Sequence, residues 1–244
     1  METEIIDVHA GIGEGRPEES RSVETALREM DEAGVAQAWI YPPEGCVAVR
    51  NREGNDFIAS AVRQYPGRFI GCAVANPWHG AAAVEELRRA FGRGLRVLYL
   101  GTHLQGVHLN DPMLDLLIRE AVEHRAPIYA HTGTPVYAMP FQLAFLARRH
   151  PDAAFLLGHM GFPDFWTDGV PAAAMAGNIL LETSLVGTEL ISEAIQGVGA
   201  ERVVFGSSIP LSHYMPELNK LRALEVSEGV LAGILARNAR RLLP

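Results

Sequence analysis

The sequence repeats one unit of secondary structure: a short apolar strand, a polar loop and an amphipathic helix. The predicted strands begin near residues 4, 36, 69, 95, 126, 153, 178 and 202. They follow one another at a mean spacing of about 28 residues, which suits one strand with its helix. About eight such units close a (β/α)8 barrel of ordinary size. We therefore predict a single TIM-barrel domain over residues 1–244.

Most of the predicted strands are continuous apolar runs, without a clean alternation of apolar and polar residues. Runs of this kind are typical of parallel strands that are buried on both faces. A doubly wound open sheet is the alternative fold. It has no support of its own, because no strand is followed by the glycine-rich fingerprint of a nucleotide phosphate site.

Composition limits the partners and the location of the chain. The 21 Lys and Arg residues are outnumbered by 29 Asp and Glu residues, and the formal net charge is −8. This balance argues against nucleic acid or an anionic membrane as a partner. Cys46 and Cys72 are too few for a disulfide framework, and the sequence contains no recognisable signal peptide or membrane-spanning run. We predict a cytoplasmic protein and leave open whether it forms a homo-oligomer.

Three histidines lie at the points where predicted strands end. His9 ends the first strand, His131 follows the fifth and His159 follows the sixth. The C-terminal ends of barrel strands meet in one mouth, where barrel enzymes carry their chemistry. We therefore predict that these three residues form the catalytic centre of one pocket that takes a small-molecule substrate. Their rings should lie within roughly 10 Å of one another, the width of a small-ligand pocket.

Further polar residues are predicted around the same mouth. The candidates for substrate binding are Asn76, Trp78, Tyr99, His103, Arg50, Arg52 and Ser208. Arg50 and Arg52 could grip an anionic substrate or could simply be solvated. Both lie in the segment 44–55, which we predict to be a long loop before a helix that begins at Asp56. A loop of this length predicts a lid that orders over the mouth when ligand binds.

Five short motifs, taken in order, resemble the amidohydrolase superfamily and most closely its amidohydrolase-2 group of metal-dependent decarboxylases and lactone hydrolases. They are Asp7-x-His9, His131-Thr132-Gly133, Gly158-His159-Met160-Gly161, Phe205-Gly206-Ser207 before Pro210, and Asn238-Ala239-x-Arg241-Leu242. Together they cover nearly the whole chain. The resemblance implies a barrel enzyme that hydrolyses a C–N or C–O bond, or removes a carboxylate, in a small organic molecule.

The resemblance also implies roles for single residues. His9 would be the first histidine of a His-x-His metal pair, and His131 would be the metal ligand of the fifth strand. His159 would lie beside the metal, where it polarises the substrate or transfers protons. Asn76-Pro77-Trp78 would line the mouth. The implied cofactor is one divalent metal ion, with zinc as the first choice.

Two positions depart from the family pattern. The second histidine of the first-strand pair would fall at Gly11, and the strand-eight aspartate, a metal ligand and general base, would fall at Ser208. Glycine offers no ligand, and a serine hydroxyl is a poor ligand for zinc. We therefore predict weak metal binding, which the double substitution Gly11→His with Ser208→Asp should strengthen. Activity should depend on His159, with an apparent pKa of about 6 to 7.

Three interpretations of the mouth stay open at this point. His9, His131 and His159 could hold one ion together with water. Alternatively, the site has no metal and the histidines act directly as acids and bases, or the pocket binds a small molecule without catalysis.

Asp7 could orient His9 or be a buried structural group. Glu182 could replace the lost carboxylate or satisfy buried hydrogen-bond donors.

Overall fold

The structure, a computed structural model, describes residues 3–15 and 20–243, which fold into one α/β barrel. Eight parallel strands pair in chain order from β1 to β8. The last strand region joins the first through hydrogen bonds from the Val8 N–H to the Phe205 carbonyl (3.0 Å) and from the Gly11 N–H to the Ile209 carbonyl (2.8 Å). The sheet therefore closes on itself. This confirms the predicted (β/α)8 barrel and excludes the open sheet.

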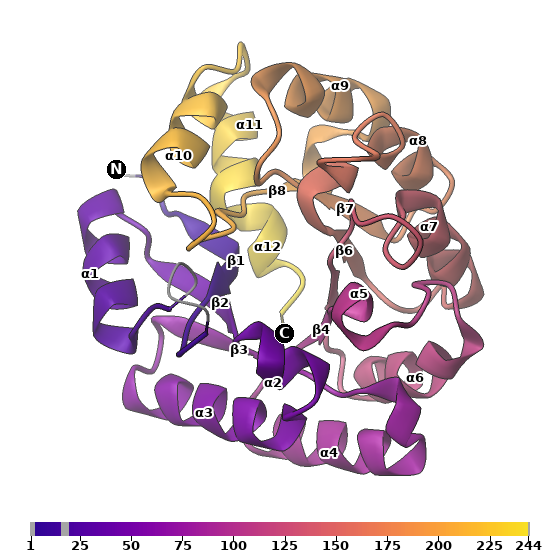
Figure 1. The fold of residues 1–244 in the computed structure, drawn as a ribbon. Coiled ribbons are helices and arrows are strands. Elements are labelled where there is room, and N and C mark those ends of the chain that lie inside the picture. The colour runs from indigo at the N-terminus through magenta and orange to yellow at the C-terminus, as the bar shows by residue number, and fades with distance from the viewer. Residues whose placement is uncertain (1–2, 16–19, 244) are drawn as a thin grey trace.

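Helices surround the ring of strands on its outer side (Figure 1). The strands are β1 (Ile6–Gly11), β2 (Gln37–Tyr41), β3 (Phe69–Ala73), β4 (Val97–Leu100), β5 (Ile128–Ala130), β6 (Phe155–Leu157), β7 (Ile179–Glu182) and β8 (Val203–Val204). The α-helices are α1 (Val23–Ala33), α2 (Glu44–Ala48), α3 (Asn51–Gln64), α4 (Ala81–Gly92), α5 (Thr102–Gln105), α6 (Asp115–Glu123), α7 (Pro140–Arg149), α8 (Gly169–Ala174), α9 (Thr188–Val198), α10 (Tyr214–Arg222), α11 (Glu228–Ala232) and α12 (Asn238–Arg240). Single helical turns lie at Pro77–His79, Pro112–Leu114, Gly158–Gly161, Ala200–Arg202 and Gly233–Arg237.

Helix α1 shows how local sequence sets the ends of an element. Ser22 caps its first turn, because the hydroxyl accepts a hydrogen bond from the Thr25 N–H (3.1 Å). Gly34 ends the helix in a left-handed conformation with φ of 71°, which glycine adopts without strain. The sequence predicts this helix over 23–33, because Val23, Leu27 and Met30 lie at core spacing and Gly34 stops it, and the structure confirms these bounds.

The segment 44–55 is not a loop, so the predicted loop is wrong, and its role as a lid stays a prediction. Helix α2 occupies its first half, and α3 begins at Asn51, five residues before the predicted start at Asp56. The Asn51 amide donates to the carbonyls of Cys46 (2.8 Å) and Val47 (2.9 Å), which α2 leaves without helical partners. A Cβ at Gly54 would lie 2.6 Å from the Cys46 Cβ, so this glycine serves close packing.

The two ends of the barrel differ. At the end where the strands begin, the C-terminal segment closes the interior: Ala236 and Ala239 pack with apolar side chains inside the barrel. Leu243 lies beside Leu95 and Ala126, which immediately precede β4 and β5. The opposite end, where the strands finish, is therefore the open one, and it carries the histidines.

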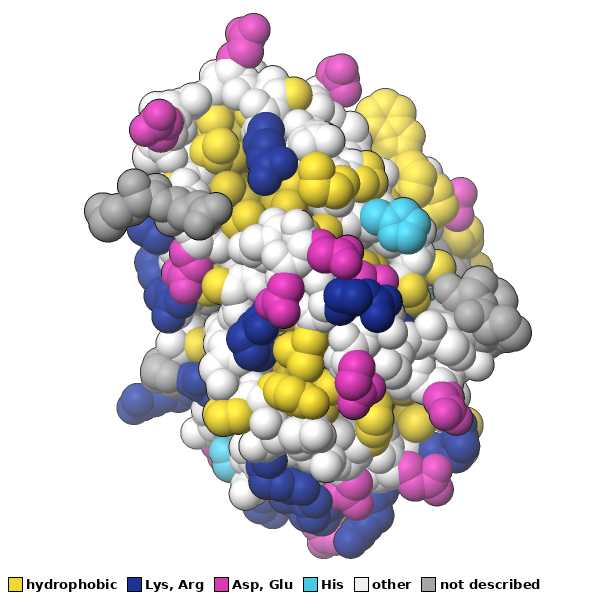
Figure 2. Space-filling view, turned by 90° about the vertical axis from the view of Figure 1, so that its left-hand side faces the viewer, with side chains coloured by type: hydrophobic (Ala, Val, Ile, Leu, Met, Phe, Trp, Pro, Cys, Tyr) yellow, Lys and Arg dark blue, Asp and Glu magenta, His cyan; other side chains and the backbone are white. Residues whose placement is uncertain are grey.

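The surface gives no sign of a single-charge patch on the face that carries α1 and α10. There, basic and acidic side chains are mixed with small groups of hydrophobic side chains (Figure 2). Within the described part of the chain, every helix is too short or too polar to cross a membrane.

Candidate functional site

The three predicted histidines meet at the open end of the barrel. The ring centroids of His9 and His159 lie 5.0 Å apart, and those of His131 and His159 also lie 5.0 Å apart. All three line one cavity of about 80 Å³ together with Tyr41 and Tyr99. The predicted convergence of the three imidazoles is confirmed.

His9 is held inside a stack of aromatic rings. Its ring lies parallel to Tyr41 and Tyr129, with centroids 4.6 and 4.3 Å away. Both ring nitrogens are buried and lack a hydrogen-bond partner among the described residues. The β1 strand carries a register irregularity between Asp7 and Ala10, so simple side-chain alternation does not extend through His9. An imidazole packed this way presents unused polar atoms at the cavity.

Asp7 supports the backbone beneath His9. Its carboxylate accepts hydrogen bonds from the His9 N–H (2.9 Å), the Ser207 N–H (2.9 Å) and the Ser207 hydroxyl (2.6 Å). Asp7 therefore ties β1 to the segment after β8 and does not bond to the imidazole. Burial is the main cause that raises its pKa to about 6.

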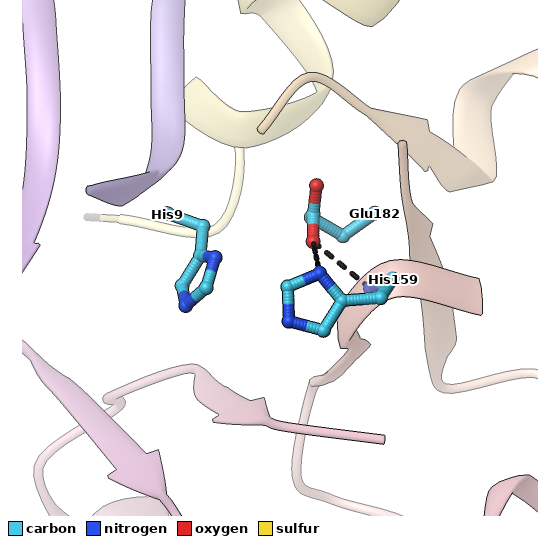
Figure 3. Close-up of side chains that lie close together, drawn as sticks. All are labelled: His9, His159 and Glu182. Atoms are coloured by element: carbon cyan, nitrogen blue, oxygen red, sulfur yellow. Dashed lines mark hydrogen bonds and ion pairs between the residues drawn. The ribbon is translucent and has the colours of Figure 1, made fainter. Parts of the chain in front are cut away.

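His159 has the most elaborate surroundings of the three. Its Nδ1 lies 2.7 Å from the Ser184 Oγ and 3.7 Å from the Glu182 Oε2, while its backbone N–H donates to the same carboxylate oxygen (3.0 Å). Figure 3 shows Nδ1 facing Glu182 and the other ring nitrogen pointing away from it. His159 and Met160 have φ of 59° and 47°, left-handed values that are costly for residues other than glycine. Strain of this kind clusters at functional sites.

Burial keeps the histidines of the cavity uncharged at neutral pH. It lowers the pKa of His159 to about 3 and that of His103 to about 4. It also holds the pKa of His9 and His131 well below the ordinary value. The predicted apparent pKa of about 6 to 7 for His159 is therefore corrected downwards, because the sequence could not show that the ring is desolvated.

Three of the predicted binding residues lie at or next to the cavity. Tyr99 and His103 line it, and the His103 ring lies 3.9 Å from that of His131. Ser208 is fully buried and donates its backbone N–H to the His9 carbonyl (3.0 Å). Its hydroxyl lacks a partner among the described residues.

The other four predicted binding residues lie outside the cavity lining. The Asn76 side chain caps a helical turn by accepting a hydrogen bond from the Trp78 N–H (3.0 Å). The Trp78 indole donates to the Gln105 carbonyl, and the Trp78 side chain is largely exposed. Arg50, which precedes α3, and Arg52, in its first turn, are exposed and pair with Glu53 and Glu86. Both lie outside the cavity lining, and their predicted contact with substrate stays a prediction.

Sequence reasoning missed three residues that shape the site: Tyr41, Tyr129 and Ser184. Tyr129 stands two residues before His131, a spacing that puts both on one face of β5. That signal could have identified it. Tyr41 pairs with Gly11 across the β1–β2 ladder, a register that only the fold supplies.

Tyr41 fills the space beside Gly11. A Cβ at Gly11 would lie 3.1 Å from both Cζ and the hydroxyl oxygen of Tyr41. A side chain at position 11 therefore requires the tyrosine ring, which also stacks on His9, to give way by a few tenths of an ångström. The glycine and the tyrosine form one packing unit.

Comparisons with known proteins agree with this geometry. The family model described as amidohydrolase matches residues 6–244. The chain belongs to the amidohydrolase family. None of the curated proteins matches its sequence.

Solved structures similar to this amidohydrolase include several decarboxylases. The 2,6-dihydroxybenzoate decarboxylase from Rhizobium has a TM-score of 0.80 at 19% identity, covering 99% of this chain and 98% of that one. The 5-carboxyvanillate decarboxylase from Sphingomonas paucimobilis has a TM-score of 0.77 at 17% identity, covering 99% of both chains. A dihydroxybenzoic acid decarboxylase from Polaromonas, solved with manganese and 2-nitroresorcinol, has a TM-score of 0.78 at 18% identity, covering 99% and 97%. At these identities the likeness shows a shared fold.

The side chains at the mouth of this amidohydrolase offer a candidate divalent-metal group, but one that suits the manganese of the similar structures poorly. Among the described residues, the one group of three candidate ligands within 4.8 Å of one another is His9, His159 and Glu182, so His131 is not part of it. The Glu182 carboxylate already accepts hydrogen bonds from Tyr129, Ser184 and the His159 backbone. The donors that remain are imidazole nitrogens, whereas manganese prefers oxygen ligands. Several of the similar structures contain manganese, which supports a divalent metal and not zinc in particular.

The packing around Gly11 leads to a prediction about metal binding. Gly11→His with Ser208→Asp supplies both missing ligands, but the new imidazole needs the space that Tyr41 occupies. We expect the double variant to retain no more metal than wild type after dialysis against manganese or zinc, measured by elemental analysis. Adding Tyr41→Ala should raise retention towards one equivalent, and Tyr41→Ala alone should not. A full equivalent in the double variant with Tyr41 in place would contradict the packing argument.

Proposed function

We propose that the chain hydrolyses a small uncharged carbonyl compound, such as an ester, lactone or amide, at the barrel mouth. His159 takes a proton from the attacking water and passes it to the leaving group, and the reaction does not depend on a metal. The observation that carries the proposal is the setting of His159: one ring nitrogen is engaged by Ser184, and the other side of the ring lines the cavity.

The charges of the cavity favour an uncharged substrate. Among the described residues its lining includes one carboxylate, Glu44, and no Lys or Arg side chain. The histidines are neutral, since burial lowers the pKa of each of them. A substrate carboxylate would be desolvated there without a counter-charge, which costs several kcal/mol.

The size of the cavity favours a small reacting group. A buried apolar cavity that accepts benzene measures about 150 Å³, and the cavity here has about 80 Å³. A carbonyl group with its attacking water fits this volume, whereas a benzene ring with hydroxyl and carboxyl substituents is larger. The remainder of the substrate would extend into the mouth past Pro43 and Leu211.

The chemistry assigned to these residues is general base and general acid catalysis. The free nitrogen of His159 takes a proton from water while the water oxygen bonds to the carbonyl carbon, and the π electrons move onto the carbonyl oxygen. A neutral His9, which has no partner in the described structure, can donate its N–H to that oxygen. Collapse of the intermediate then breaks the bond to the leaving group, which receives the proton from His159.

Decarboxylation of an aromatic acid is the second candidate, because several of the similar solved structures are decarboxylases. The test is a substrate panel with chelator-treated protein: small lactones, simple esters and amides against 2,6-dihydroxybenzoate and 5-carboxyvanillate. We expect acid release from a neutral substrate without added metal. Release of CO₂ that requires added manganese would favour the second candidate. Ligand-induced stabilisation without any turnover would favour a binding protein.

A further inference from the structure

A chain of polar contacts runs from the end of β7 to the His159 ring. Glu182 is fully buried, and its Oε2 accepts from the Tyr129 hydroxyl (2.9 Å) and the Ser184 hydroxyl (2.9 Å), as well as from the His159 backbone. Its Oε1 accepts from the Ser184 N–H (2.5 Å). A Cβ at Gly206 would lie 2.2 Å from this Oε1, so glycine at this position leaves the space that the carboxylate occupies.

Counting protons in this chain decides which nitrogen of His159 carries hydrogen. Burial raises the pKa of Glu182 and four hydrogen bonds act against that rise; each carboxylate oxygen accepts from a backbone N–H, which is the pattern of the ionised form. An ionised carboxylate only accepts, so the single proton of the Ser184 hydroxyl is directed to Glu182. The Ser184 Oγ can then offer only a lone pair to Nδ1, 2.7 Å away. Nδ1 must therefore be the donor, and Nε2 carries the lone pair.

We infer that Ser184 and Glu182 are positioning residues that hold neutral His159 in its Nδ1–H tautomer and thereby turn Nε2 into the proton acceptor at the cavity. The catalytic consequence rests on the proposed function, whereas the tautomer itself does not. The contact between Glu182 and the His159 N–H also holds the left-handed backbone that aims the ring. Orientation of a catalytic imidazole by a hydrogen-bonded acceptor is an established way of fixing its tautomer.

The tautomer can be measured directly in the folded protein. In chelator-treated protein with ¹⁵N-labelled histidine, long-range ¹H–¹⁵N correlations distinguish a protonated ring nitrogen from one with a lone pair. We expect Nδ1–H for His159 in the wild type. Ser184→Ala removes the acceptor and should shift the ring towards Nε2–H. Ser184→Thr keeps a hydroxyl and should restore the wild-type pattern.

Thr183→Val is the matched control, because Thr183 is equally buried at the same strand end but its hydroxyl faces the Gly206 N–H (3.4 Å). It should leave the tautomer unchanged. With an active substrate, Ser184→Ala should lower kcat on the order of 10-fold or more, with little change in KM.

Each result separates the inference from the proposed function. A wild-type Nε2–H tautomer would overturn the inference even if Ser184→Ala fails to fold, and so would a tautomer that Ser184→Ala leaves unchanged. The expected tautomer shift without turnover of any substrate in the panel would support the positioning role and reject the hydrolase. The shift together with a lower kcat would support both.

Discussion

Acidification from pH 7 to pH 5 is expected to lower the free energy of unfolding of this protein. Burial lowers the pKa of His9, His131 and His159 from the ordinary 6.5, in the case of His159 to about 3. His9 and His159 are fully buried, and His131 is partly buried. The unfolded chain therefore binds protons below pH 6.5 that the folded chain does not, and the free energy of unfolding falls with pH. His159 alone costs about 2 kcal/mol at pH 5, and His9 and His131 add to this cost.

Asp7 acts in the opposite direction. Burial raises its pKa from 3.8 to about 6, so the folded state holds this proton more tightly and gains stability as pH falls from 6 to 4. At pH 5 it offsets about 1.4 kcal/mol. The three histidines act against this one carboxylate, so we expect a net loss of stability, in a domain whose total stability is typically about 5 to 15 kcal/mol. His103, which is partly exposed like His131, acts in the same direction as the three histidines.

Urea unfolding followed by circular dichroism from pH 7.5 to pH 5 measures this effect. The free energy of unfolding should fall as the pH is lowered below the ordinary histidine pKa of 6.5. His159→Asn removes one of the three groups and should flatten the slope, whereas His79→Asn, at an exposed site, should not. A flat profile down to pH 4 would mean that the buried imidazoles accept protons within the fold.

The barrel could be predicted because its signals are local and repeated. Strand β7 spans the predicted residues 179–182, and α1 spans the predicted 23–33. The prediction of a loop over segment 44–55 failed because α2 has only five residues, too few to show a helical period in the sequence. The end of α2 is stabilised by hydrogen bonds from Asn51. The close approach of Gly54 to Cys46 depends on the three-dimensional packing, which the sequence does not show.

The candidate site could be predicted in part for a related reason. The ends of parallel strands meet in any barrel, so the meeting of His9, His131 and His159 follows from their positions in the chain. Tyr41 lies beside Gly11 because of the register of β1 against β2, and no local sequence pattern reveals this register. The low pKa values have the same origin, because desolvation depends on how many neighbours enclose a ring.

The largest effect on turnover is expected from His159→Asn. Asparagine keeps an N–H donor near the position of Nδ1, so the contact with Ser184 can persist, and it tolerates the φ of 59° better than most residues. It lacks the second ring nitrogen, and with it the proton acceptor at the cavity. General acid–base catalysis contributes about 10²- to 10⁴-fold, so kcat should fall by that factor while KM changes little.

The pH dependence of the wild type provides an independent check on the same residue. Because burial lowers the pKa of His159 to about 3, the imidazole is already neutral at pH 5.5. We expect kcat/KM to show no acid limb near pH 6 to 7, and to decline only where the protein unfolds. His79→Asn, outside the cavity, should match the wild type in both measurements.

If His159→Asn retained more than about a tenth of wild-type kcat, proton transfer would have to be assigned to another group. His131 and His103 would then be the next candidates, since both line the cavity as neutral imidazoles.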